Sequence, residues 1–99
     1  MGTKKTWLEG KTALVTGGAK RLGQAISLSL ASQGVNVIIH YGKSQSEASE
    51  LVKRIEQYGV KAWLVSGDLG QVSDVESIFN KALEFASPIR ILINNASIF

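Results

Sequence analysis

Short apolar segments alternate with helical periodicities along almost the whole chain. Four runs rich in β-branched and aliphatic residues have the length of buried strands, namely 12–16, 35–39, 62–66 and 89–94. Between them, apolar residues recur at helical spacing over about 21–33, 45–58 and 73–85. Strands that alternate with helices pair in parallel through right-handed crossovers. The sequence therefore predicts an α/β fold with a doubly wound parallel sheet of about four strands and three helices.

Glycines and short polar motifs indicate where the helices begin and end. Gly34 and Gly59 are placed to end the first and second helices. The pairs Ser44/Glu47 and Ser73/Glu76 have the spacing of capping boxes. The side chains expected to face the core are Leu22, Ala25, Ile26, Ser29 and Leu30 in the first helix, Ala48, Leu51, Val52 and Ile55 in the second, and Val75, Ile78, Phe79 and Ala82 in the third.

Composition excludes several classes of protein. With 99 residues, no cysteine and one histidine, the chain has room for one domain and no disulfide or thiolate metal site, and we expect no metal. The net charge of +3 comes from scattered basic residues, which argues against nucleic acid as a partner. No apolar run approaches the length of a membrane span and no secretory signal is evident. We expect a cytoplasmic protein that binds a small molecule and not a membrane.

The predicted sheet is incomplete, because no further helix or strand follows the fourth strand in this sequence. Residues 1–10 look like a lead-in, and 11–99 like the amino-terminal part of a single domain whose sequence stops at Phe99, shortly after the fourth strand. A doubly wound sheet of six strands needs about twice this length. We therefore expect a truncated sheet whose fourth strand has an open edge, and a homo-oligomer because such edges pair with other chains.

A glycine-rich segment joins the first expected strand to the first expected helix. It contains Gly17, Gly18, Arg21, Leu22 and Gly23. Glycines there permit positive φ and close approach of backbone N–H groups to a phosphate, and the helix start adds its positive dipole end. The alternative is an ordinary tight turn, but the position within the first βαβ unit favours binding of a dinucleotide pyrophosphate.

The end of the second strand indicates which dinucleotide is bound. An NAD site places a carboxylate there for the ribose 2′-hydroxyl, whereas an NADP site has cations for the 2′-phosphate. Residues 35–46 contain no Asp or Glu but include His40, Lys43 and Ser44, and Arg21 can approach from the glycine turn. This favours NADP(H). Ser44 could instead be only a helix cap, and for His40 a packing or phosphate-adjacent role is favoured over that of a catalytic base.

Three motifs in chain order resemble the short-chain dehydrogenase/reductase family. They are the glycine turn with Thr16, Gly17 and Gly23, the pair Asp68-Leu69 after the third strand, and Asn94-Asn95-Ala96 at the end of the fourth. The resemblance implies a Rossmann-type dinucleotide-binding domain. It also implies that Asp68 and Leu69 contact the adenine, and that Asn95, Ala96 and Ser97 lie at the inner ribose and nicotinamide.

Two departures from the family pattern are similar to the pteridine reductase branch. Arg21 replaces the middle glycine of the turn, and Ser97 follows Asn-Asn-Ala where glycine is usual. The segment from His40 to Ser44 and the terminal Phe99 share this similarity. By that resemblance Phe99 would stack on a pterin ring, with Ser97 and Arg21 lining the substrate pocket. Otherwise Phe99 is a core aromatic and Arg21 a surface residue.

The family's catalytic pair is not found in this sequence. Short-chain reductases use a tyrosine followed four residues later by lysine, with a serine nearby, whereas Tyr41 is followed by Gln45 and Tyr58 by Ala62. No catalytic residue is therefore assigned, and we expect the chain itself to be inactive. The main hypothesis is the NADPH-binding half of an oxidoreductase that transfers hydride to a carbonyl or imine substrate such as a dihydropterin. The alternatives are a non-catalytic dinucleotide-binding module and a structural fragment that self-associates through its open edge.

Overall fold

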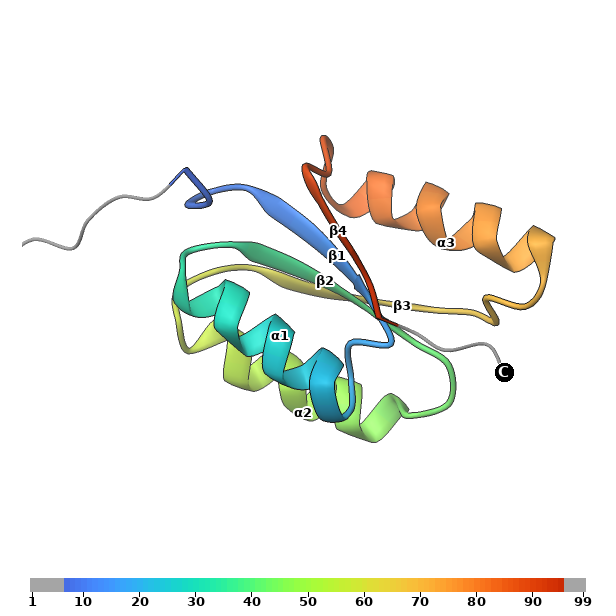
Figure 1. Ribbon diagram of the computed structural model, residues 1–99, viewed down its shortest axis with the longest axis horizontal. Helices are drawn as coiled ribbons and strands as arrows, with labels where there is room; N and C mark the ends of the chain where they lie inside the picture. The colour runs from blue at the N-terminus through green and yellow to red at the C-terminus, as the bar shows by residue number, and fades with distance from the viewer. Residues whose placement is uncertain (1–6, 96–99) are drawn as a thin grey trace, which may run out of the picture.

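The computed structural model describes residues 7–95 of the chain (Figure 1). Over this range the chain forms four strands and three helices in strict alternation. Their order is β1 (Thr12–Thr16), α1 (Arg21–Ser32), β2 (Asn36–Tyr41), α2 (Gln45–Glu56), β3 (Ala62–Ser66), α3 (Val72–Phe85) and β4 (Ile91–Asn94). None of the helices in this range combines the length and apolarity that crossing a bilayer requires.

All strands pair in parallel, in the order β3-β2-β1-β4. The chain builds outward from β1 to β2 and β3, and then crosses back through α3 to place β4 on the other side of β1. Accordingly α1 and α2 cover one face of the sheet and α3 covers the opposite face (Figure 1). The predicted α/β doubly wound sheet is therefore confirmed, and its strand order reverses at β1.

The alternation of side chains along the strands divides the core into two layers. Val15, Val37 and Ile39 pack against Ala31 of α1 and against a buried stripe of α2. Leu14, Ile38 and Val65 face the other way, against Ile78 and Ala82 of α3. Because β1 and most of β2 are buried on both faces, these strands are continuous apolar runs.

The element positions agree with the sequence-based expectation, but the capping boxes were wrong. At Ser44 only the backbone carbonyl joins the helix, accepting from the Ala48 N–H at 2.9 Å, and the hydroxyl makes no capping hydrogen bond. Glu47 instead lies 3.7 Å from the ammonium of Lys20. Helix α3 begins before Ser73, with Gln71 as its cap residue. Gly34 and Gly59 do follow their helices, each with φ of +85°.

The expected inner face of α1 was wrong for Leu22, Ala25 and Ser29, which are exposed, whereas Leu30 does pack against the core as predicted. The residues buried beneath this helix are Gly23, Ser27 and Ala31, whereas Leu22 is 64% exposed. The close seat of the helix on the glycine turn turns its small side chains inward, and the Ser27 hydroxyl donates to the Gly23 carbonyl oxygen at 2.8 Å. The predicted faces of α2 and α3 are confirmed, because Leu51 and Ile78 are buried.

Replacing Leu51 with alanine tests the core between α2 and the sheet. Its side chain is completely buried, so Leu51→Ala should lower the free energy of unfolding by about 2–5 kcal/mol. Urea denaturation followed by circular dichroism measures this. Leu83→Ala, which makes the same change on α3 at a side chain 46% exposed, should cost well under about 1 kcal/mol. Equal losses would contradict this packing.

Candidate functional site

The candidate site lies at the carboxyl end of the sheet, where the strand order reverses. Neighbouring parallel strands end there in Thr16 of β1, Asn94 of β4 and Tyr41 of β2. In open α/β sheets, the crevice at such a switch point is where ligands bind. The loops that leave these three strands contain most of the site residues expected from the sequence.

The turn after β1 has an unusual backbone. Gly17 has φ of +62°, and Arg21, at the first position of α1, has φ of +50°. A non-glycine residue in the left-handed region is uncommon and marks a conformation imposed by its surroundings. The Gly18 N–H donates to the His40 carbonyl oxygen at 2.9 Å, which ties the turn to β2.

Gly23 allows α1 to sit directly on this turn. A Cβ atom added there would overlap the Gly17 carbonyl oxygen and lie 2.8 Å from both Gly18 Cα and the Asn95 side-chain nitrogen. No side chain fits in that space. The first turn of α1 is consequently held beside the end of β1, which aims its amides at the crevice.

His40 holds the glycine turn and the β3 end together from within. Its ring is buried, with only 3% of the residue exposed. The Gly17 N–H donates to Nδ1 at 3.0 Å, and Nε2 lies 2.9 Å from the Gly67 carbonyl oxygen. A backbone N–H can only donate and a carbonyl can only accept, so the ring is neutral with its proton on Nε2. Both ring nitrogens are thereby occupied within the protein, in keeping with the packing role considered for His40, and its contact with a 2′-phosphate stays a prediction.

Thr16 and Asn95 join β1 to β4 beside the turn. The Asn95 N–H donates to the Thr16 hydroxyl oxygen at 3.0 Å, and the Asn95 amide nitrogen donates to the Gly17 carbonyl oxygen at 3.1 Å. The Thr16 hydroxyl is also 3.3 Å from the Ile93 carbonyl and from the Asn94 side-chain oxygen. The turn is therefore anchored from β2 by His40 and from β4 by Asn95.

No acidic side chain of α1 balances the positive end of the helix dipole at its first turn. Its cap residue Lys20 makes no side-chain capping bond, and its first turn contains no acidic residue, unlike the first turns of α2 with Glu47 and α3 with Asp74. The first N–H groups of a helix have no partners within it and carry the positive end of the dipole. An anion placed at this end of α1 would therefore be stabilised by the helix.

The loop between β2 and α2 presents polar groups beside the turn. Lys43 is exposed, and the Ser44 hydroxyl is not used to cap the helix. Within residues 7–95 neither Arg21 nor Lys43 takes part in an ion pair. The charge of both residues is therefore available to an external anion.

The loop after β3 is shaped by one carboxylate of its own and by one from α3. An Asp68 carboxylate oxygen accepts the Gly70 N–H at 2.8 Å, and the Asp68 N–H donates to a carboxylate oxygen of Asp74 at 2.9 Å. Asp68 stays exposed, while Leu69 packs at the edge of the α3-side core. No grouping of residues suited to a metal ion occurs in the described part of the chain.

The structure brings the turn residues, His40 and Asn95 into one bonded network. Ala96, Ser97 and Phe99 lie outside the described residues, so their predicted roles stay predictions. Sequence reasoning named Thr16 only as part of the family motif, and it did not name Gly67. The only signal for Gly67 in the sequence was a glycine directly after the third strand. The structure gives the reason for it, because a Cβ there would lie 2.7 Å from the Ile78 side chain.

The sheet, its reversal at β1 and the glycine turn define a nucleotide-binding α/β protein. The sequence pattern of the family described as short chain dehydrogenase matches residues 11–99. The chain belongs to this family.

Several relatives resemble the chain at similar levels. It is 41% identical to the short-chain dehydrogenase/reductase homolog YusS of Bacillus subtilis, over 89% of this chain and 81% of that protein. It is 40% identical to L-rhamnose 1-dehydrogenase (NADP(+)) of Thermoplasma acidophilum, over 91% of this chain and 35% of that protein. The chain thus spans about a third of the length of that enzyme.

Solved structures of NADP-bound reductases and dehydrogenases also resemble this chain. The crystal structure of FolM alternative dihydrofolate reductase 1 from Brucella canis, complexed with NADP, superposes with a TM-score of 0.82 at 42% identity, covering 91% of this chain and 36% of FolM. A putative dehydrogenase from Burkholderia cenocepacia with bound NADP has a TM-score of 0.84 at 36% identity, over 88% of this chain and 34% of its own. The similarity to FolM supports the pteridine reductase-like branch expected from Arg21.

Gly23→Ala tests the close seat of α1. Alanine is the better helix former by about 1 kcal/mol, but the overlap with the Gly17 carbonyl should outweigh that gain. We expect a net loss of about 1–3 kcal/mol in urea denaturation. Gly42→Ala is the matched control, because a Cβ there meets nothing within 4 Å. A Gly23→Ala chain as stable as the parent would disprove the contact.

The His40 tautomer can be observed directly. Nitrogen-15 NMR of the imidazole at neutral pH should show a neutral ring protonated at Nε2, with Nδ1 accepting a hydrogen bond. The same chain unfolded in urea provides the control, in which the ring should exchange between forms. An Nδ1-protonated ring in the folded chain is incompatible with the Gly17 bond and would refute the arrangement.

Proposed function

We propose that this chain is the NADPH-binding half of a short-chain oxidoreductase that transfers hydride to a carbonyl or imine substrate. The observation that carries the proposal is the uncapped, acid-free amino end of α1, which lies against a glycine turn at the switch point of the sheet. Family membership supports the reaction class. NADP in the structures of FolM and the Burkholderia dehydrogenase supports the choice of cofactor.

The pyrophosphate is assigned to the glycine turn. Gly17, Gly18, Arg21, Leu22 and Gly23 would surround it, with the first amides of α1 as donors. The anchoring of this turn by His40 and Asn95 supports the assignment, because a preorganised turn loses little entropy when the ligand binds.

The 2′-phosphate is assigned to the loop after β2. Lys43 and the Ser44 hydroxyl would contact it, together with the guanidinium of Arg21. Two observations support this role. The Ser44 hydroxyl does not cap α2, and within residues 7–95 neither Lys43 nor Arg21 forms an ion pair. His40 then acts as a positioning residue for the turn.

The remaining cofactor groups follow from the family resemblance. Asp68 and Leu69 would border the adenine, while Asn95, Ala96 and Ser97 would border the inner ribose and nicotinamide. Arg21, Ser97 and Phe99 are proposed to line the substrate pocket, with a dihydropterin as the substrate. Bound NADPH would supply the hydride. The proton donor is not assigned, because neither tyrosine in the sequence precedes a lysine by four residues.

An alternative role is that of a non-catalytic module or fragment that self-associates. Strand β4 lies at the sheet edge, and its Leu92 is 54% exposed. Exposed apolar residues on α1 and α3, among them Leu22 and Val72, add to the surface available to a second copy. A dimeric mass without nucleotide binding would favour this alternative, and the homo-oligomer remains a proposal.

Lys43→Asp tests the cofactor assignment. The reversed charge should repel the 2′-phosphate, so we expect NADPH affinity to fall by at least about tenfold while NADH affinity changes little. Isothermal titration of the 99-residue chain with each cofactor measures both.

Lys81→Asp makes the same charge change on α3, away from the site, and should alter neither affinity much. Equal losses for NADPH and NADH in Lys43→Asp would show that Lys43 does not recognise the 2′-phosphate. If the parent chain binds neither cofactor, the self-associating fragment becomes the better description.

A further inference from the structure

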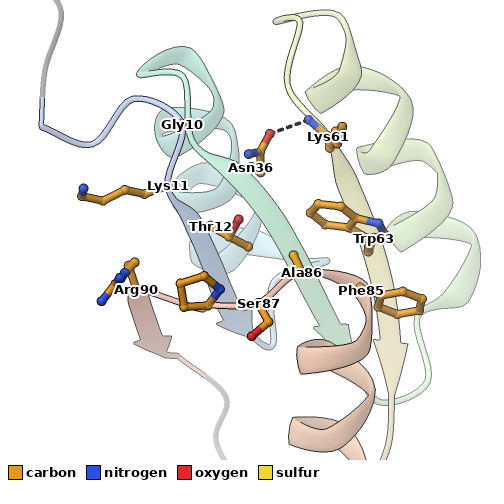
Figure 2. A pocket seen from close by; sticks show the side chains of 11 residues that line it. Gly10, Lys11, Thr12, Asn36, Lys61, Trp63, Phe85, Ala86, Ser87 and Arg90 are labelled. Carbon is orange, nitrogen blue, oxygen red and sulfur yellow. Dashed lines mark hydrogen bonds between the residues drawn. The ribbon is translucent and has the colours of Figure 1, made fainter.

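A hollow lies at the opposite end of the sheet from the proposed nucleotide site. It has a volume of about 470 Å³ and is lined by the amino ends of β1 and β2, the start of β3 and the segment from Phe85 to Arg90 (Figure 2). Since the proposed cofactor site uses the carboxyl ends of the strands, none of its residues borders this hollow.

The hollow is electropositive. Lys11, Lys61 and Arg90 line it, and no acidic side chain does. Within residues 7–95 none of these three cations is in an ion pair. Lys11 lies 5.8 Å from the centre of the Trp7 ring, a contact that leaves its charge uncompensated. Three uncompensated cations around one concave surface favour an anionic ligand.

A buried hydroxyl faces the hollow without a partner. Thr12 is only 8% exposed and lines the hollow from β1. Among the described residues its hydroxyl makes no hydrogen bond, although its backbone carbonyl accepts the Arg90 N–H at 3.0 Å. Buried polar side chains are nearly always paired, so a hydroxyl without a partner at the wall of a hollow points to a ligand oxygen as its partner.

The other end of the hollow is aromatic. The rings of Trp63 and Phe85 stack with centroids 6.4 Å apart and planes 12° from parallel. Figure 2 shows Lys11 and Arg90 at one end, Trp63 and Phe85 at the other, and Thr12 between them. This arrangement suits a molecule with a negative group at one end and a flat ring at the other.

We propose that this hollow binds a small aromatic carboxylate. The carboxylate would accept hydrogen bonds from the Thr12 hydroxyl and the Arg90 guanidinium, and the ring would lie against Trp63 and Phe85. The inference does not depend on the cofactor assignment, because the two sites share no residue.

The test uses benzoate and nitrogen-15 NMR of the 99-residue chain. Benzoate should cause saturable shifts at the amides of Thr12 and Arg90 and at the Trp63 indole N–H. Benzyl alcohol, which lacks the charge, and acetate, which lacks the ring, should each bind at least about tenfold more weakly. The paired change Lys11→Gln and Arg90→Gln should weaken benzoate by a similar factor.

The matched control removes two cations elsewhere, by Lys53→Gln together with Lys81→Gln, and should leave benzoate binding unchanged. Three results would overturn the proposal. They are shifts that do not saturate, shifts confined to the glycine turn, and equal affinity for benzoate and benzyl alcohol. The comparison of probes uses the unaltered chain, so it holds even if the paired variant fails to fold.

Discussion

The close contact between α1 and the turn after β1 is the constraint on which the rest of the site depends. It requires the absence of a side chain at Gly23, whose Cβ would overlap the Gly17 carbonyl oxygen. With the helix seated there, its amino end meets the crevice between β1 and β4, and its small residues face the sheet. The same seat explains why the larger Leu22 is left exposed. A helix placed farther out would lose the alignment of its amides with the strand ends.

Two side chains from neighbouring strands then hold the turn. His40 bridges the Gly17 N–H and the Gly67 carbonyl, and Asn95 bonds the Gly17 carbonyl from the β4 side. Buried polar groups that satisfy one another in this way rigidify a unique geometry. The amides of Gly17 and Gly18 fix the turn through their bonds to His40, which leaves the first amides of α1 to face an anion. The two ends of the sheet therefore offer an anion different groups. The carboxyl end has the first amides of α1, and the amino end has the cations around the buried Thr12 hydroxyl.

Much of the fold was predictable because it depends on local periodicity. The alternating strand and helix patterns placed all seven elements within a few residues, and the inner faces of α2 and α3 followed from apolar spacing. The capping boxes failed because side-chain partners decide them, as when Glu47 pairs with Lys20. In the site, the glycine turn was recognisable by type and position. The double bridge made by His40 was not, because its partners Gly17 and Gly67 are brought together only by the pairing of β1, β2 and β3.

The sequence by itself determined the class of fold, the position of the glycine-rich turn and the absence of an acid after the second strand. These features lie within single stretches of chain, where residue type and spacing are sufficient. Only the tertiary structure decided which face of α1 is buried, which tautomer His40 adopts and that Thr12 faces a cationic hollow. Each of these depends on atoms from strands far apart in the sequence. Steric exclusion at Gly23 and the pairing of hydrogen-bond donors with acceptors select one arrangement among those that the pattern permits.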